Sequence, residues 1–305
     1  MIMKHRYETP ELKILRSLHI RMKLDAKNHH YYLNLEKGYK GEQQFDKWLE
    51  PHLKNKIILH DILLEHNNTI FQIDSLLITS NTIYLFEIKN YEGDFYIEGG
   101  RWFSLSNTEI KDPLLQIRRT ESIFRRLLEE LTFTFPIETY LIFVNPEFQL
   151  YQTPLNLPLV FSTQLHRFSQ KLEKYSSSLL TDTHIKLAKQ LLSLHLTESP
   201  YTRLPHYQFD TLKKGIYCPL CLSFYSSFPN KKTLKCNKCG SSENYHNALL
   251  RNIEEFIFLF PKRKVTTNII HEWCSIIKSK KTIRKILSQN YKQIGHSSSS
   301  HYVRL

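Results

Sequence analysis

The residues best suited to chemistry are two acids and a lysine within a strongly apolar stretch. Asp74 lies in the run Ile70–Thr79, and Glu87 and Lys89 lie in the run Thr82–Asn90. Both runs are rich in β-branched and aromatic residues, which predicts two strands. A two-residue loop between them makes the pair a hairpin, and the register of that hairpin places Asp74 directly opposite Glu87.

The same register gathers further polar residues beside this pair of acids. Gln72 falls opposite Lys89, and alternation along each strand directs these two side chains to the same face as the acids. We expect Ile73, Phe86 and Ile88 to lie on the other face. Because both faces of these strands are otherwise apolar, polar groups in them are costly unless something satisfies them.

Two carboxylates in this position call for a cation. Opposed β carbons lie ~5 Å apart, so the charges of Asp74 and Glu87 repel unless a positive ion lies between them. Hard oxygen ligands suit Mg²⁺ or Mn²⁺, and Lys89 beside them can orient or help deprotonate a water. The alternative is a salt bridge between Lys89 and one acid, which leaves the second acid unexplained.

Four of the five cysteines form two Cys-x2-Cys pairs, which is typical of a zinc ribbon. Cys218 and Cys221 are separated from Cys236 and Cys239 by 14 residues. Four thiolates fill a tetrahedral zinc site, so we expect structural rather than catalytic zinc, contributing on the order of 10 kcal/mol to folding. Disulfides are the alternative, disfavoured by the reduced compartment that we expect below. Cys274, the fifth, is expected to be a small buried apolar residue.

All the net charge lies in the last third of the chain. Residues 1–210 hold 25 basic and 25 acidic side chains, whereas residues 211–305 hold 17 basic and 4 acidic ones, which accounts for the formal charge of +13. Lys and Arg gain affinity for nucleic acid by displacing counterions from phosphate, so the C-terminal third predicts contact with DNA. A solubilising surface is the alternative.

A helical pattern with a basic face supports this prediction. We expect helices at 247–260, at 266–274 and at 279–290, followed by two short extended stretches around Gly295. In the last helix one face is apolar and the opposite face carries Lys280, Lys281, Arg284 and Lys285. Three helices and a two-stranded wing favour a winged helix-turn-helix, whose last helix enters the major groove. A merely solvated basic helix is the alternative.

The N-terminal half predicts an α/β domain around the two acids. A further strand, Ile57–Glu65, precedes the hairpin, and a helix starting at Pro113 with the strand Ile137–Asn145 follows it. The resulting order is α-β-β-β-α-β. We expect a short strand at Leu157–Phe161 and two more helices before residue 195.

This order and four short motifs resemble the nuclease-related domain (NERD), a family of the restriction-endonuclease-like nucleases with a D…(D/E)xK core. The resemblance covers about residues 36–145. It rests on Gly38-Tyr-Lys-Gly41-Glu42 as a helix start, on Ile73-Asp74, on Glu87-Ile-Lys89-Asn-Tyr91-Glu-Gly93, and on Pro113-Leu-Leu-Gln116. It implies a mixed sheet flanked by helices and metal-dependent hydrolysis of DNA.

The resemblance assigns roles to single residues. It implies that Asp74 and Glu87 hold Mg²⁺ or Mn²⁺, with Lys89 near the attacking water. Glu42 resembles the helix acid that completes the site, although an acid near a helix start is also simply favourable there. Gln116 resembles a glutamine that contacts substrate or a water. Four arginines on the same helix are candidates for phosphate contacts or for an exposed face shared with acids: Arg118, Arg119, Arg125 and Arg126.

The whole chain is therefore expected to combine several parts. These are an N-terminal helical region at 1–35, a nuclease-like domain at 36–195 with its core at 36–145, a linker at 196–212, a zinc ribbon at 213–245 and a basic winged-helix-like domain at 247–305. With no apolar run near the ~20 residues that cross a bilayer, and both charges mixed at the start, we expect neither membrane span nor secretion signal, hence a cytoplasmic protein.

Two other functions remain open from the sequence. The nuclease fold can serve as the scaffold of a non-catalytic DNA-binding regulator or processing accessory protein. Alternatively, the ribbon can contact a protein partner while the basic tail is incidental. Loss of DNA affinity with added salt separates phosphate contacts from a protein interface.

Overall fold

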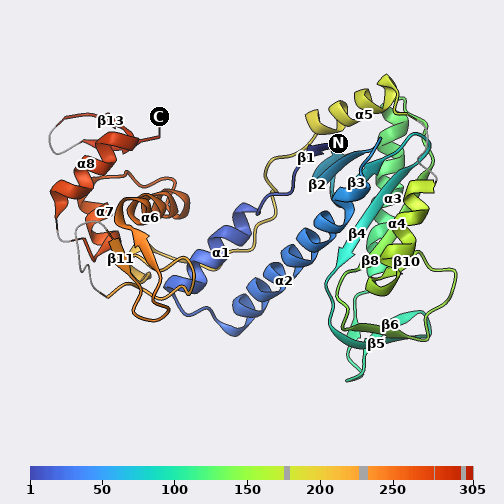
Figure 1. The fold of residues 1–305 in the computed structure, drawn as a ribbon, viewed down its shortest axis with the longest axis horizontal. Coiled ribbons are helices and arrows are strands. Elements are labelled where there is room, and N and C mark those ends of the chain that lie inside the picture. Colours follow the sequence, from blue (N-terminus) through green and yellow to red (C-terminus); the bar gives the residue numbers. More distant parts are fainter. Residues whose placement is uncertain (175–178, 227–232, 278, 297–299, 305) are drawn as a thin grey trace. The chain divides into compact units, whose positions relative to one another are not determined.

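The computed structural model describes residues 1–174, 179–226, 233–277, 279–296 and 300–304, and the chain divides into two compact units (Figure 1). The first unit comprises Met1–Thr9 and Leu33–Thr202. The second comprises Pro10–Tyr32 and Arg203–Leu305. The chain therefore enters each unit twice.

The first unit is built on a mixed six-stranded sheet. In sheet order the strands are β1 (Ile2–Lys4), β2 (Ile57–His66), β3 (Thr69–Ile78), β4 (Ile83–Lys89), β8 (Ile137–Phe143) and β10 (Leu159–Phe161). Strands β2, β3 and β4 are antiparallel, whereas β1 runs parallel to β2, and β8 runs parallel to both β4 and β10. This sheet confirms the predicted α/β class.

Helices cover both faces of the sheet (Figure 1). They are α2 (Ala26–Leu49), α3 (Pro113–Glu130), α4 (Leu165–Lys174) and α5 (Asp182–Ser193). On one face, apolar side chains of α3 and α5, including Phe124 and Leu191, pack on the sheet. On the other face, α2 and α4 contribute side chains such as Phe45 and Phe168. The helices of both layers place apolar residues three or four positions apart on the side that packs against the sheet.

The β3–β4 hairpin has the predicted register. Its ladder pairs Ile78 with Ile83 at the turn and ends where Ser75 pairs with Phe86, and Thr79 N–H closes the loop on Thr82 O. A second tight turn joins β2 to β3. Its two asparagines, at positions 67 and 68, both have the positive φ that such turns need.

Strict alternation fails in β2 and β3 at one level of the sheet, which corrects one expectation. Ile73 lies in the cluster beneath α3 and α5, whereas Phe86 and Ile88 lie in the cluster beneath α2 and α4. The cause is Asp61, whose φ of 52° interrupts β2 opposite Asp74. Beyond this point both strands present the opposite parity to α3 and α5, so Ile73 does not share a face with Phe86 and Ile88.

The predicted helix start at Gly38 is also wrong. Helix α2 begins at Ala26, so Gly38, Gly41 and Glu42 lie in its interior. No proline or glycine lies between Ala26 and Gly38, and the side chain of Asp25 accepts from Asn28 N–H at 2.8 Å, which starts the helix early. A favourable charge in the first turn of a helix therefore does not explain the acid at position 42.

A second, four-stranded sheet lies in the first unit. Its strands in sheet order are β7 (Glu109–Ile110), β6 (Arg101–Ser104), β5 (Gly93–Glu98) and β9 (Phe148–Tyr151). Trp102, buried to 1% exposure, packs with Phe143 and Phe148, and this aromatic cluster joins the small sheet to β8.

The second unit contains the cysteine pairs and a group of helices. Its elements are α1 (Pro10–Arg21), β11 (Thr233–Lys235), β12 (Ser242–Asn244), α6 (Tyr245–Leu259), α7 (Thr267–Cys274), α8 (Lys280–Asn290), β13 (Lys292–Ile294) and β14 (His301–Val303). Helices α7 and α8 begin at the N-caps Thr266 and Ser279, whose side chains accept backbone N–H bonds. Strands β13 and β14 pair antiparallel, and Val265 bridges to Tyr302.

Arg21 at the end of α1 is enclosed within this second unit. It is 2% exposed, donates through Nε to Glu255 at 3.0 Å, and its guanidinium lies 3.8 Å from the Trp273 ring centroid. A buried charge of this kind requires such a partner, so α1 is tied to α6 and α7 by an ion pair as well as by apolar packing.

None of the helices among the described residues combines the length and apolar character that a bilayer span requires.

Candidate active site and metal centre

Asp74 lies where strands β3 and β4 part. The ladder ends at Ser75 and Phe86, so the next inward-facing N–H on β4, that of Ile88, lacks a partner on β3. The carboxylate of Asp74 takes that place, accepting from Ile88 N–H through Oδ2 at 2.8 Å. The side chain is 8% exposed. Because a buried N–H must be satisfied, this bond fixes the carboxylate between the two strands.

Glu87 and Lys89 stand on β4 beside this point. Glu87 is 3% exposed, and its Oε1 accepts from Lys89 Nζ at 2.6 Å. The same ammonium donates to Gln116 Oε1 on α3 at 3.3 Å. Burial and the charge of Asp74 raise the pKa of Glu87 to about 7. Burial acts to lower the pKa of Lys89, but the charges of Glu87 and Asp74 outweigh it and raise this pKa.

Glu42 reaches the same group from helix α2. Burial, and after it the charge of Asp74, raise the pKa of Glu42 to about 8. This pKa is raised even though Arg6 forms an ion pair with Glu42 at 2.6 Å. Asp74 thus opposes the ionisation of both glutamates, and the three acids form one interacting group. The residues brought together are Glu42, Asp74, Glu87, Lys89 and Gln116.

Gln72 takes a different partner from the one expected. Its amide donates to Asp61 Oδ1 at 2.7 Å, whereas Lys89 bonds to Glu87 and Gln116. The reason is the break in alternation at Asp61, which changes the face of the sheet on which the first residues of β3, including Gln72, lie. The four-residue polar cluster of the hairpin is therefore reduced to Asp74, Glu87 and Lys89.

Asp61 and Arg6 are members of the site that the sequence did not reveal. Burial raises the pKa of Asp61, and the charge of Asp74 adds to this. Arg6 donates to Glu42 and to the main-chain oxygen of Asp74. An aspartate within an apolar strand pattern was a signal for Asp61, but Arg6 had none because it lies far upstream.

The chemistry of this donor set, carboxylate oxygens, suits a hard divalent cation, although the ligand atoms of these three described acids do not all lie within 4.8 Å of one another. The two glutamates are buried and have raised pKa values beside the charge of Asp74, so a bound cation would favour their ionised form. Asp74 and Glu87 offer oxygens on neighbouring strands and Glu42 a third from α2. Lys89 forms an ion pair with Glu87, so its ammonium neutralises part of the acidic charge of the group.

The arginines of α3 do not share one environment. Arg125 pairs with Glu121 at 2.7 Å across one helical turn, and Arg126 donates to Ser122 O. Arg118 and Arg119 are exposed. An acid-paired surface thus accounts for Arg125, and the exposed pair stays a candidate for phosphate.

The four cysteines of the second unit converge. Their four sulfur atoms all lie within 4.8 Å of one another, and among the described residues no other group of three or more His, Cys, Asp or Glu side chains meets this distance. Cys218 Sγ lies 3.7 Å from Cys239 Sγ, and Cys221 Sγ lies 3.4 Å from Cys236 Sγ. The group could hold a metal ion in a four-sulfur site.

Two matching turns produce this convergence. Leu222 N–H donates to Cys218 O, and Gly240 N–H donates to Cys236 O, both at 2.9 Å. The residue after each second cysteine has a positive φ, 60° at Leu222 and 73° at Gly240. Glycine takes this conformation at no steric cost, and leucine does not.

The cysteines are not equally prepared for a cation. Backbone N–H donation from Cys239 acts to lower the pKa of Cys236, but burial and hydrogen bonds with Cys221 and Cys239 raise it to about 11. Burial acts to raise the pKa of Cys218, but hydrogen bonds from Ser241 Oγ and from backbone N–H groups, including that of Cys221, lower it to about 6. Thiolates are the form that binds metal. Cys274 is fully buried, as predicted, and burial raises its pKa to about 12.

The basic residues of α8 share an exposed face. Ile283, Ile286 and Leu287 are buried on the opposite side of the helix. The exposed basic side chains are Lys280, Lys281, Arg284 and Lys285.

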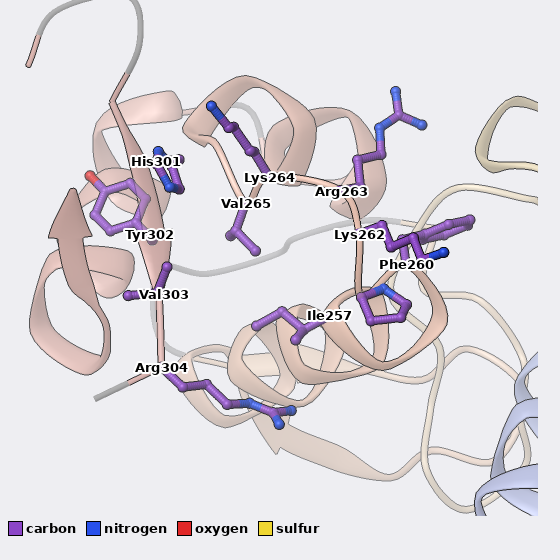
Figure 2. Close-up of a pocket in the computed structure, with 11 residues that line it drawn as sticks. Ile257, Phe260, Lys262, Arg263, Lys264, Val265, His301, Tyr302, Val303 and Arg304 are labelled. Carbon is purple, nitrogen blue, oxygen red and sulfur yellow. The ribbon is translucent and has the colours of Figure 1, made fainter. Parts of the chain in front are cut away.

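A cavity of about 340 Å³ adds further basic residues to the second unit (Figure 2). Its lining comes from the end of α6, the following loop and β14. Ile257 and Val265 face one another across it, whereas Arg263 points away and lies 4.1 Å from the Phe209 ring centroid. The exposed basic residues of its lining are Lys262, Arg263, Lys264 and Arg304.

Residues 37–144 match the family model of the nuclease-related domain, NERD. No curated protein matches the chain. The crystal structure of protein VC1899 from Vibrio cholerae aligns with 10% identity and a TM-score of 0.25, covering 53% of this chain and 40% of that one. The chain thus spans well under half of that protein. The family match sets the fold of the first unit as restriction-endonuclease-like.

Proposed function

Residues 37–144 are a nuclease-related domain, and on that premise we propose that this protein is a metal-dependent nuclease that hydrolyses DNA phosphodiester bonds. The observation that carries the proposal is the buried group of Glu42, Asp74 and Glu87 at the split between β3 and β4, with Lys89 beside it. A structural role alone gives no reason to gather three mutually repelling acids.

Asp74 and Glu87 would hold the Mg²⁺ or Mn²⁺ ion, with Glu42 as a further oxygen donor. Such an ion supplies positive charge that offsets the charge on the phosphate and makes a nearby water more acidic. Raised pKa values mean that the two glutamates would release protons when a cation binds, because the cation favours their ionised form beside the charge of Asp74.

Lys89 would orient the substrate rather than act as a base. Its raised pKa keeps it as an ammonium at neutral pH, so it has no lone pair with which to take a proton. It can instead donate to a non-bridging phosphate oxygen while Gln116 Oε1 fixes its position. In hydrolysis a water oxygen bonds to phosphorus, the ester P–O bond breaks, and the leaving oxygen gains a proton.

The second unit would hold the DNA. The order α6, bridge at Val265, α7, α8, β13 and β14 supports a winged helix-turn-helix, with α8 as the helix that meets the groove. The four thiols would bind Zn²⁺ as a structural ion, because four sulfurs leave no open position. The basic residues around the cavity in Figure 2 extend the charge available for phosphate.

Cleavage of plasmid and single-stranded DNA tests the proposal. We expect the full chain to cut with Mg²⁺ or Mn²⁺, and expect Asp74→Ala and Lys89→Ala to lose cutting while they bind DNA as the wild type does. Arg101→Gln, at an exposed position of strand β6 in the small sheet, serves as the control that keeps full activity. A wild type that binds DNA but never cuts with either ion would falsify the enzymatic function.

The second candidate is a DNA-binding regulator or processing accessory protein. The Lys89–Glu87 ion pair favours it to a degree, because it neutralises one acid without a metal. In that case Mn²⁺ should fail to bind at Asp74, and calorimetric titration of the zinc-loaded protein separates the two candidates.

A further inference from the structure

Arg6 reaches the candidate site from outside the nuclease-related domain. Its side chain is 3% exposed. One terminal nitrogen donates to Glu42 Oε2 at 2.6 Å, and the other donates to Asp74 O at 2.6 Å. One guanidinium thus contacts an acid of the proposed site and the main chain of another.

The opposite edge of this guanidinium is fixed by Asp46. Arg6 donates to both carboxylate oxygens of Asp46, through Nε at 2.8 Å and through the second terminal nitrogen at 3.2 Å. Asp46 in turn contacts His60 Nδ1 at 3.0 Å. Glu42 and Asp46 lie one turn apart on α2, so the planar guanidinium spans both and sets the distance of Glu42 from β3.

The segment that carries Arg6 is itself anchored in the sheet. Strand β1 runs parallel to β2 and pairs Ile2 with Ile58. Lys4 Nζ donates to the main-chain oxygens of His60 and Asp61 at 2.9 and 2.6 Å. These bonds lie where β2 departs from regular geometry. The N-terminal segment therefore braces the level of the sheet at which Asp74 stands.

We propose that Arg6 is a positioning residue of the nuclease site, which holds the carboxylate of Glu42 and the main chain of Asp74 in place for the divalent ion. The inference rests on the proposed function. It extends the working site to residues 1–9, beyond residues 37–144 of the matched domain. Lysine cannot replace Arg6 fully, because a single ammonium cannot meet Glu42, Asp46 and Asp74 in one plane.

Removing Arg6 should weaken both metal binding and the chemical step. Groups that orient metal ligands typically contribute 10–100-fold to affinity or activity. We therefore expect Arg6→Gln to lower Mn²⁺ affinity and kcat about 10–100-fold, with KM for DNA unchanged. Arg6→Lys should fall between Arg6→Gln and the wild type.

The decisive measurement is the coupling between Arg6 and Glu42. The full-length zinc-loaded chain is titrated with MnCl₂ by calorimetry, and plasmid cleavage is measured in parallel, for the wild type, Arg6→Gln, Glu42→Gln and the double variant. If Arg6 acts through Glu42, the double variant loses about as much as Glu42→Gln alone. Losses that multiply, or a change in KM alone, overturn the inference.

Two controls keep the result clear. Arg101→Gln removes an exposed arginine of the same unit and should leave Mn²⁺ affinity and kcat at the wild-type values. If Arg6→Gln fails to fold by circular dichroism, Arg6→Lys is combined with Glu42→Gln and judged by the same coupling.

The outcome distinguishes this inference from the proposed function. A wild type that binds Mn²⁺ but cuts no DNA removes the nuclease function, and the Mn²⁺ affinities still decide the role of Arg6. A wild type that cuts while Arg6→Gln cuts equally well removes only the inference. Absence of Mn²⁺ binding by the wild type overturns both.

Discussion

The carboxyl groups of Glu42, Asp74 and Glu87 lie close enough that the charge of Asp74 opposes the ionisation of both glutamates. In the unfolded chain the glutamates ionise near their ordinary pKa of about 4.3. In the folded chain the values are about 8 and about 7. The folded state therefore binds more protons than the unfolded state between these limits, and its stability falls as pH rises through that window.

We expect the metal-free protein to lose thermal stability between pH 5 and pH 8. The contribution of the protonated glutamates is fully present below pH 4 and is lost as the pH passes the folded-state values. Thermal unfolding of the zinc-loaded chain, freed of Mg²⁺ and Mn²⁺, measures the loss. Glu42→Gln, which cannot ionise at this position, should show a smaller fall over the same range, and an equal fall would contradict the assignment.

Mn²⁺ should reverse this dependence. Ligand oxygens must be deprotonated to bind, so the rise in Tm on adding Mn²⁺ should be larger at pH 8 than at pH 6. An equal rise at both pH values would place the ion elsewhere. Differential scanning fluorimetry across a Mn²⁺ series is sufficient, with Glu87→Gln as the variant that should show little rise.

Only some of the residues in the candidate site could be predicted from the sequence. Asp74, Glu87 and Lys89 could be predicted to meet because a two-residue loop fixes the register of a hairpin. Asp61 stood out as an aspartate within an apolar strand pattern, but the positive φ that places it opposite Asp74 could not be predicted from that. Arg6 could not either, because its contacts depend on how an upstream segment joins the sheet.

Helix α2 can approach the end of strand β4 closely because Gly41 has no side chain. A Cβ at Gly41 would lie 2.5 Å from Asn90 Cβ, whereas at Gly38 it would meet nothing within 4 Å. The amide of Asn90 donates to Lys37 O at 2.8 Å. Gly41 therefore permits the approach that brings Glu42 to the other acids.

These two glycines form a matched pair for mutation. Gly41→Ala should destabilise the protein by about 1–3 kcal/mol through overpacking against Asn90. Gly38→Ala should stabilise it by about 0.5–1 kcal/mol, because an interior helical alanine orders at less entropic cost. Urea unfolding measures both, and equal effects of the two substitutions would show that the contact with Asn90 has no energetic weight.

The cysteine turns depend on a metal in a way that can be measured. We expect one zinc per chain by elemental analysis, and expect Cys236→Ser and strong chelators to unfold the second unit. Zinc binding is worth on the order of 10 kcal/mol in small sites of this kind. Cys274→Ala should keep the full zinc content, because its thiol is buried away from the other four. Zinc retained after Cys236→Ser would exclude a four-sulfur site.

Elements with long apolar runs were the predictable ones. The strands of the hairpin and helices α3, α6, α7 and α8 follow from apolar periodicity, and Thr266 follows as the N-cap of α7. The small sheet was missed because its strands are only two to six residues long. Gly99 and Gly100, both with positive φ, were the available signal for its first hairpin. The start of α2 at Ala26 could not be predicted from the spacing of its residues.

For the molecule as a whole, charge is divided along the chain rather than balanced. The excess of basic residues after position 210 means that affinity for DNA should fall steeply as salt rises, with a log–log slope of about 0.9 for each phosphate contacted. Phosphate contacts of this type carry little base preference.

A double substitution on α8 tests where those contacts lie. Lys281→Gln with Lys285→Gln should lower DNA affinity and reduce the salt slope by about 1–2. Lys186→Gln with Lys189→Gln removes the same charge from exposed positions of α5 and should leave the slope unchanged. Fluorescence anisotropy over a salt series gives both slopes, and equal slopes for the two variants would exclude α8 as the contact.

The alternation of the chain between units bears on how the protein is made. Residues 10–32 leave the ribosome long before their partners in the second unit, including Glu255 and Trp273. Arg21 therefore stays solvated until Glu255, 234 positions further along the chain, has been synthesised. Vectorial folding can thus complete neither half independently. Cutting the gene between codons 202 and 203 should yield two fragments, each missing a piece of its own interior.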